Sequence, residues 1–263
     1  MKIIKQIFSP FFTLWAIFWF LGFVLLILPV IWFLKLFRSK TADSDFYNFG
    51  SGYARFWMFI CGIPYRIHDR EKYYKKGQPY VVCSNHISNM DIFSSSIPIY
   101  TPLRIFAKSE IKKMPFIGSA FSMVSVFVDR SNAESRRKSF EKISSELRNG
   151  GYSVLIYPEG TRNKTDYPLR DFYDGAFKLA IQAQVPIAFF VVTNTRSILN
   201  PRKLLMQPFG SIDVYFLPPY ETKGLTDKDL YALKCKVHKD AWDLIVEKDP
   251  NFKNVTTYVA PKE

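Results

Sequence analysis

The pattern of apolar and polar positions divides the chain into two regions. Residues 6–34 contain no charged side chain, whereas the rest alternates short apolar runs with amphipathic stretches. As one helix the first segment would be roughly 43 Å long, against a bilayer core of about 30 Å. Two shapes therefore fit it: one tilted or kinked membrane-embedded helix, or a helical hairpin that turns near Gly22. Basic residues on both flanks favour the hairpin, with both ends in the cytosol.

The second region has the pattern of an α/β domain. Six apolar runs predict strands, at Tyr80–Ser84, Leu103–Ala107, Ser125–Val128, Ser153–Tyr157, Ile187–Val192 and Ile212–Phe216. Helical patterns lie between several of them, at Ala133–Arg148, Gly175–Gln184 and Asp227–Lys248. This alternation predicts a mostly parallel central sheet flanked by helices. We divide the chain into a membrane-embedded segment at 1–40, a membrane-proximal connector at 41–65 and a catalytic domain at 66–263.

Charge and composition narrow the range of partners. The net charge of +13 and the pI of about 9.5 suit an anionic partner. The N-terminal region is rich in aromatic residues and the body is basic, which favours a membrane surface over a nucleic acid. The three cysteines, Cys61, Cys83 and Cys235, lack the spacing of metal ligands, and we interpret them as reduced cytosolic thiols. No metal site is expected.

A candidate catalytic pair follows the first strand of the body. His86 stands just after the apolar run, and Asp91 comes five residues later. The two can meet only if the chain turns between them, which Ser88 and Asn89 favour. Asp91 would then accept the Nδ1 proton of His86 and leave Nε2 free as a base, which typically contributes about 10²–10⁴-fold. The alternative is a turn histidine bonded to the backbone, with Asp91 an ordinary helix-start residue.

Two other strand ends carry charged side chains. The strand that ends at Tyr157 continues as Pro158-Glu159-Gly160-Thr161-Arg162, and the strand Ser125–Val128 continues as Asp129-Arg130. Arginine offers a planar fork for phosphate or carboxylate. A base and two arginines at one sheet edge suit a hydroxyl substrate that carries a phosphate. A solvated turn at Glu159–Arg162 and a surface ion pair at Asp129-Arg130 are the alternatives.

These residues together resemble a known family. Asn85-His86, four residues and then Asp91 resemble the NHx₄D block of glycerolipid acyltransferases. The family's next three blocks resemble Val126–Arg130, Tyr157–Arg162 and Val185–Ile187. The blocks occur in the family's order and cover about residues 80–192. The group that the chain resembles most is the 1-acyl-sn-glycerol-3-phosphate acyltransferases.

The resemblance implies a mechanism and a set of site residues. His86, oriented by Asp91, would deprotonate the hydroxyl of lysophosphatidic acid, which attacks the thioester of acyl-CoA or acyl carrier protein. No cofactor or metal is implied. Arg130 would hold the phosphate of the acceptor. The remaining residues implied to bind substrate are Asn85, Glu159, Gly160, Thr161 and Arg162. The protein would then be a membrane enzyme of phospholipid synthesis, with its catalytic domain on the cytoplasmic face and membrane lipids as partners.

Departures from the family pattern leave the acceptor open. Ala188-Phe189-Phe190 stand where the fourth block usually carries a second proline, and Tyr157 replaces the usual phenylalanine. One alternative is therefore an acyltransferase that uses another lysophospholipid or an amino-acid lipid. A second is a peripheral protein without enzymatic activity that binds anionic lipid, in which His86 is structural.

Overall fold

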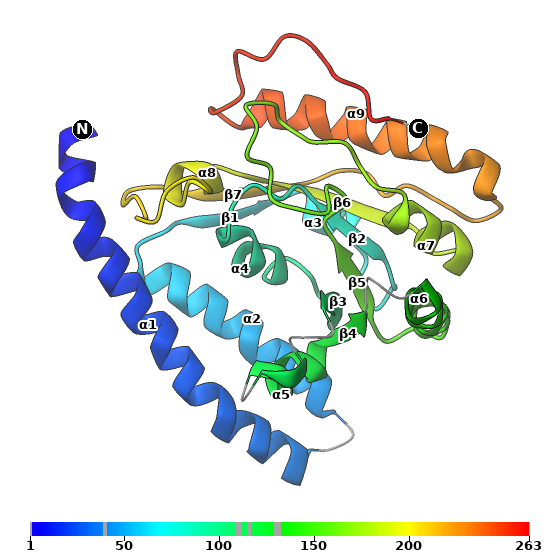
Figure 1. Cartoon of the computed structure of the whole chain (residues 1–263), viewed down its shortest axis with the longest axis horizontal. Helices are drawn as coiled ribbons and strands as arrows, with labels where there is room; N and C mark the ends of the chain where they lie inside the picture. The colour runs from blue at the N-terminus through cyan, green and yellow to red at the C-terminus, as the bar shows by residue number, and fades with distance from the viewer. Residues whose placement is uncertain (1, 39–40, 109–111, 115–116, 129–132, 263) are drawn as a thin grey trace.

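A mostly parallel seven-stranded sheet forms the centre of the molecule (Figure 1). The computed structural model describes residues 2–38, 41–108, 112–114, 117–128 and 133–262. The strands are β1 (Tyr65–His68), β2 (Val81–Ser84), β3 (Leu103–Lys108), β4 (Ser125–Val128), β5 (Ser153–Ile156), β6 (Ile187–Thr193) and β7 (Ile212–Phe216). Their order is β1-β7-β6-β2-β5-β3-β4, and among the pairs between these described strands β6–β7 is antiparallel and the others are parallel. The predicted α/β fold is confirmed.

Helices cover both faces of the sheet (Figure 1). They are α1 (Lys2–Phe37), α2 (Ala42–Ile60), α3 (Arg70–Tyr73), α4 (Met90–Ser96), α5 (Ile117–Val124), α6 (Ala133–Arg148), α7 (Gly175–Ala183), α8 (Thr195–Ile198), the 3₁₀ turn η2 (Asp227–Asp229) and α9 (Leu230–Lys248). Alternate residues of each central strand reach opposite cores, as the pleat requires. Cys83 and Phe189 pack with α6, α7 and α9, whereas Val82 and Phe190 pack with α2 and α4.

Of the two shapes that fit the N-terminal segment, the structure has the single continuous helix and not the hairpin at Gly22 that the flanking basic residues favoured. Gly22 lies in the middle of α1, and α2 runs back antiparallel beside it (Figure 1). The indole of Trp57 donates to the Ala16 carbonyl at 2.9 Å, and the Tyr53 hydroxyl donates to the Trp19 carbonyl. These long-range contacts with α2 hold the middle of α1 helical. By length and composition, α1 is able to cross a membrane.

The segment predicted to be a connector, residues 41–65, contains helix α2. Trp57 is buried against the core, while Phe56, which contacts Trp19 of α1, and Phe59 remain exposed. Strand β1 was not predicted, because Tyr-Arg-Ile-His is short, polar at two positions and only partly buried at the edge of the sheet. The described structure thus joins both N-terminal helices to the sheet through shared apolar contacts.

Candidate active site

The sheet topology brings the predicted motifs together. β2 lies between β5 and β6 and runs parallel to both, so His86 after β2 and Tyr157 after β5 emerge at the same edge. Asn85 lies one residue before the histidine and is fully buried. Its amide donates to the Val192 carbonyl at 2.9 Å and accepts the Val192 N–H at 2.8 Å. Asn85 therefore fixes the end of β2 to β6, and its predicted role in substrate binding stays a prediction.

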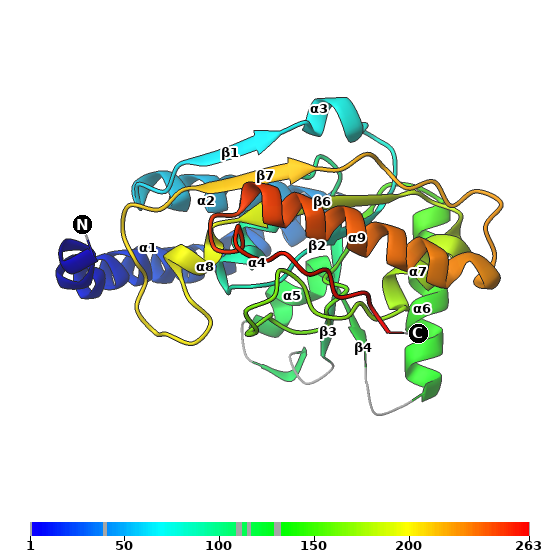
Figure 2. The ribbon, with the colours of Figure 1, turned by 90° about the horizontal axis from the view of Figure 1, so that it is seen from above.

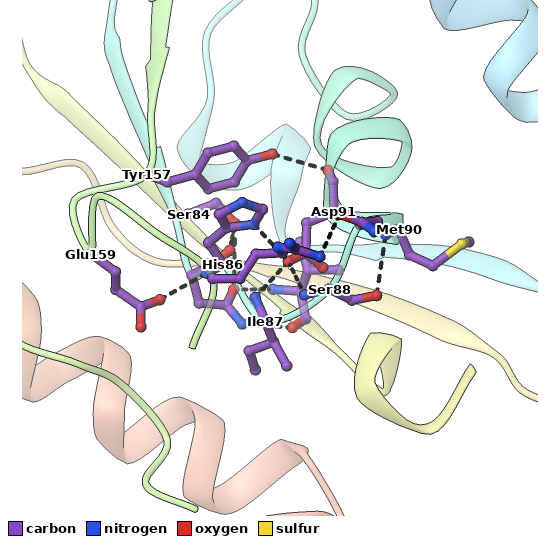
Figure 3. Close-up of polar contacts among 12 residues, drawn as sticks. Ser84, His86, Ile87, Ser88, Met90, Asp91, Tyr157 and Glu159 are labelled. Atoms are coloured by element: carbon purple, nitrogen blue, oxygen red, sulfur yellow. Dashed lines mark hydrogen bonds and ion pairs between the residues drawn. The ribbon is translucent and has the colours of Figure 1, made fainter. Parts of the chain in front are cut away.

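His86 and Asp91 form a hydrogen-bonded pair. Nδ1 of His86 lies 3.0 Å from Oδ2 of Asp91 (Figure 3). The same oxygen accepts the backbone N–H groups of Ile87 at 2.6 Å and Ser88 at 2.7 Å, and the carboxylate is fully buried. The predicted turn is present, because α4 begins at Met90 and places Asp91 in its first turn. These donors and the helix N-terminus compensate the buried negative charge.

The contacts of Asp91 fix the tautomer of His86. Because backbone N–H groups only donate, Oδ2 acts as an acceptor and Nδ1 carries the proton. Nε2 is then left with its lone pair, and no group in the described part of the chain donates to it. The imidazole also stacks on the ring of Tyr157, with centroids 4.2 Å apart at 18°. Both the tautomer and the plane of the ring are therefore held in a form suited to a general base.

Tyr157 connects the two motifs. Its hydroxyl donates to the Asp91 carbonyl oxygen at 3.1 Å (Figure 3). Burial raises the pKa of Tyr157 above its ordinary value, so the phenol remains a hydrogen-bond donor. The sequence showed Tyr157 only as a replacement for phenylalanine. Its position inside the motif, together with the added hydroxyl, was the available signal for this role.

Glu159 binds the backbone of His86. Its Oε1 accepts the backbone N–H of His86 at 2.8 Å, and its Oε2 accepts the N–H of Arg170 at 2.9 Å. The side chain is fully buried, and burial raises the pKa of Glu159 to about 8, against the opposing effect of the two N–H donors. Since both oxygens bind backbone, Glu159 holds two loops together.

The turn after Glu159 requires glycine. Gly160 has φ +67°, and a Cβ there would lie 2.7 Å from the ring of Tyr173. The next two residues, Thr161 and Arg162, are exposed and partly buried respectively. Arg162 donates from Nη1 to the Asn89 side chain at 2.8 Å, which fixes its guanidinium above the start of α4. Arg130 and Asp129 lie outside the described residues.

A cavity of about 560 Å³ joins these groups to the N-terminal helices. One end is lined by His86, Tyr157, Gly160, Thr161 and Arg162. The rest is mainly apolar and extends between the sheet and the helices α1, α2 and α4, with lining residues that include Phe23, Ile27, Phe46, Ala54, Phe93 and Leu155. The volume lies within the range of about 300–1,000 Å³ that is typical of ligand pockets. The cavity has room for a long apolar chain and reaches His86.

The other two histidines and the two buried cysteines are not among the residues that line this cavity. His68 bonds to Asp213 at 2.9 Å on the β1–β7 edge, and His238 lies on α9. Burial raises the pKa of Cys83 and also raises the pKa of Cys61 to about 12, so both thiols are poor nucleophiles at neutral pH. In the described residues, no cluster of three His, Cys, Asp or Glu side chains has the geometry to hold a metal ion.

Comparisons with known proteins agree with this arrangement. A family model described as Acyltransferase matches residues 65–193. A Caenorhabditis elegans protein with the provisional name 1-acyl-sn-glycerol-3-phosphate acyltransferase acl-2 is 30% identical, over 74% of this chain and 67% of its own. The 1-acyl-sn-glycerol-3-phosphate acyltransferase of Saccharomyces cerevisiae is 29% identical, over 72% of this chain and 62% of its own length. The 1-acyl-sn-glycerol-3-phosphate acyltransferase alpha of Mus musculus is 33% identical, over 61% of this chain and 56% of its own length.

The fold has also been seen in a solved structure. The crystal structure of the 1-acyl-sn-glycerophosphate (LPA) acyltransferase PlsC from Thermotoga maritima matches with a TM-score of 0.75 and 19% identity, and covers 97% of this chain and 100% of that one. In sequence, the match spans about 56–67% of the length of the three relatives. From the matched family model and the 30% identity to a relative covered over two thirds of its length, the chain belongs to the acyltransferase family.

Proposed function

We propose that this protein transfers a fatty acyl group from an acyl thioester to the free hydroxyl of lysophosphatidic acid and thereby forms phosphatidic acid. The observation that carries the proposal is the His86–Asp91 pair, 3.0 Å apart, at one end of the apolar cavity. The names of the relatives support lysophosphatidic acid as the acceptor. The base, the apolar cavity and the neighbouring arginine match the three parts of that substrate pair: hydroxyl, acyl chain and phosphate.

The reaction proceeds by direct transfer. Nε2 of His86 takes the proton of the acceptor hydroxyl as the oxygen attacks the thioester carbonyl. The resulting imidazolium is stabilised by the Asp91 carboxylate, which keeps its own hydrogen bonds throughout. The tetrahedral intermediate then collapses, the C–S bond breaks, and the imidazolium returns its proton to the leaving thiolate. The products are the ester and a free thiol, and no cofactor or metal is required.

The cavity would orient both substrates. The apolar part, between the sheet and α1 and α2, accommodates the acyl chain, since burial of each CH₂ contributes about 0.8 kcal/mol. Arg162 lines the same end as His86 and offers a bidentate site for the phosphate of the acceptor. Arg130 is proposed as a second phosphate ligand from the resemblance of its motif. Gly160 and Thr161 line this end of the cavity as well.

The protein is proposed to act at a membrane, with its catalytic domain on the cytoplasmic face. The apolar helix α1 lines the cavity through Phe23 and Ile27, so a lipid chain would enter from the membrane side. The positive net charge would attract anionic lipid to this face. The donor is acyl-CoA or acyl carrier protein, both of which present the same thioester to His86.

The test is thiol release by the purified protein in detergent micelles. Palmitoyl-CoA is supplied with or without lysophosphatidic acid, for the wild type, His86→Ala and the exposed control Glu221→Gln. Release that requires both the acceptor and His86 is the expected result, with the thermal unfolding of His86→Ala close to that of the wild type. If a folded His86→Ala protein releases thiol at the wild-type rate, the proposed mechanism is wrong.

A panel of donors and acceptors separates the alternatives. Acyl carrier protein thioesters are tested beside CoA thioesters, and other lysophospholipids and amino-acid lipids beside lysophosphatidic acid. Turnover with a different lysolipid alone would keep His86 as the base and change the acceptor. Lipid binding that survives both His86→Ala and Asp91→Asn, with no turnover on any pair, would favour a binding protein.

A further inference from the structure

The loop of residues 200–210, between α8 and β7, exposes apolar side chains. Leu204 is 93% exposed, Leu205 43% and Phe209 70%. Apolar side chains gathered on one exposed loop are typical of a surface that contacts a partner. Neither the catalytic pair nor the cavity uses these three residues.

The loop is fastened to the N-terminal half of α1. The Ser9 hydroxyl donates to the Met206 carbonyl at 2.6 Å, and the Met206 N–H donates to Thr13 Oγ1 at 2.9 Å. The Gln207 side chain donates to Ser9 Oγ at 3.0 Å. Ser9 and Thr13 are buried polar residues in the uncharged part of α1, and both bond to this loop. Figures 1 and 2 both show the loop beside α1.

The end of α1 that bonds to the loop also exposes apolar side chains. That helix presents Ile3, Ile7, Phe8 and Phe11 near its N-terminus, each more than half exposed. Two basic residues directly precede Leu204: Arg202, which pairs with Asp166 at 3.6 Å, and the exposed Lys203. An exposed lysine next to apolar side chains matches the boundary between anionic headgroups and acyl chains.

We propose that the 200–210 loop is a second membrane-contacting element, whose partner is a bilayer that contains anionic phospholipid. Leu204, Leu205 and Phe209 enter the acyl region, and Lys203 contacts headgroup phosphates. A single helix in a bilayer can roll about its own axis. The loop lies beside that axis and is fixed to α1 by hydrogen bonds to Ser9 and Thr13. Its contact with the bilayer therefore prevents rotation of α1 and sets the orientation of the α/β domain.

Insertion is tested by fluorescence quenching in reconstituted vesicles. The full chain carries Cys235→Ser, because Cys61 and Cys83 are buried, and an environment-sensitive NBD probe is attached at L204C or F209C. V259C, a 44% exposed site on the C-terminal tail, is the control. The loop probes should be quenched by doxyl-labelled lipid and protected from aqueous iodide, and the control probe should behave in the opposite way.

Two outcomes would overturn the proposal. The first is iodide quenching of the loop probes equal to that of the control probe. The second is protection from iodide without quenching by doxyl lipid, which would mean that protein covers the loop.

Lipid charge is tested with Lys203→Gln and the exposed control Lys228→Gln. Doxyl quenching of the loop probes should be stronger in vesicles that contain phosphatidylglycerol than in vesicles of phosphatidylcholine alone. Lys203→Gln should reduce this difference and Lys228→Gln should not. An equal reduction in both variants would contradict the contact between Lys203 and anionic headgroups.

The consequence for catalysis rests on the proposed function. Leu204→Ser combined with Phe209→Asn removes the apolar contact, and asparagine tolerates the left-handed backbone of Phe209, whose φ is +61°. Activity on vesicles should fall about tenfold, with activity in micelles unchanged. Equal activity of this variant and the wild type on vesicles would contradict the orienting role. An inactive wild type in micelles would contradict the proposed function alone, because the quenching measurements need no turnover.

Discussion

Glu159 holds His86 through the backbone: its Oε1 accepts the His86 N–H at 2.8 Å, while its Oε2 accepts the Arg170 N–H at 2.9 Å. The main chain of His86 is held on its other side as well, because its carbonyl accepts the Asn163 N–H at 2.6 Å. The imidazole is therefore positioned by bonds to both ends of its own residue, in addition to Asp91 and Tyr157. Such positioning is what a general base requires.

Glu159→Gln should lower stability and activity together. Glutamine keeps the size of the side chain but offers only one acceptor oxygen, so one buried N–H loses its partner at a cost of about 1–3 kcal/mol. We expect a lower unfolding temperature in detergent and a loss of thiol release of at least about tenfold. Glu221→Gln, at an exposed position, is the control. A wild-type unfolding temperature for Glu159→Gln would contradict the bridging role.

Asp91→Asn should reduce kcat and leave the KM for both substrates nearly unchanged. The asparagine oxygen can still accept the three N–H bonds, but it lacks the charge that stabilises the imidazolium. We expect a loss of kcat of about 10²–10⁴-fold. Steady-state thiol release gives both constants. A change confined to KM would mean that Asp91 acts in substrate binding.

Gly160→Ala should destabilise the turn after Glu159 for two separable reasons. The backbone at φ +67° disfavours any side chain, and the new Cβ would lie 2.7 Å from the Tyr173 ring. We expect a cost of about 1–3 kcal/mol. Adding Tyr173→Ala, which truncates a 67% exposed side chain, should restore the steric part only. Full recovery in the double variant would show that backbone strain contributes little.

Gly50→Phe tests whether the cavity holds the acyl chain. Gly50 lines the cavity on α2, and open space surrounds the position of its Cβ, so the new ring should enter the cavity without displacing backbone. Thiol release from long-chain donors should fall relative to short-chain donors. Gly52→Phe, two residues away and exposed, has the same effect on helix propensity and should leave the ratio unchanged. Identical chain-length profiles in both variants would place the acyl chain elsewhere.

Much of the fold and the pairing of His86 with Asp91 could be predicted because local patterns agreed with the tertiary structure. Central strands such as Ile187–Thr193 are buried on both faces and form continuous apolar runs. The turn residues Ser88 and Asn89 allowed His86 to face Asp91. The continuity of α1 through Gly22 depends on packing against α2, which no local pattern reports. The hydrogen bond between the Glu159 side chain and the His86 N–H likewise depends on the pairing of β2 with β5.

His238 should make the stability of the fold depend on pH, because it bonds to Arg170, the residue whose N–H donates to Glu159. Its Nε2–H donates to the Arg170 carbonyl at 3.1 Å, so Nδ1 accepts the Tyr258 hydroxyl at 3.1 Å, an arrangement that only the neutral ring allows. Burial lowers the pKa of His238 from 6.5 to about 4. Between these values the unfolded chain binds a proton that the folded protein does not. Stability is therefore complete above pH 6.5 and is lost as the pH falls toward 4, by up to ~3 kcal/mol. Unfolding in micelles across this range should show the loss in the wild type and a smaller one in His238→Gln, and equal losses would mean that His238 does not titrate as the geometry requires.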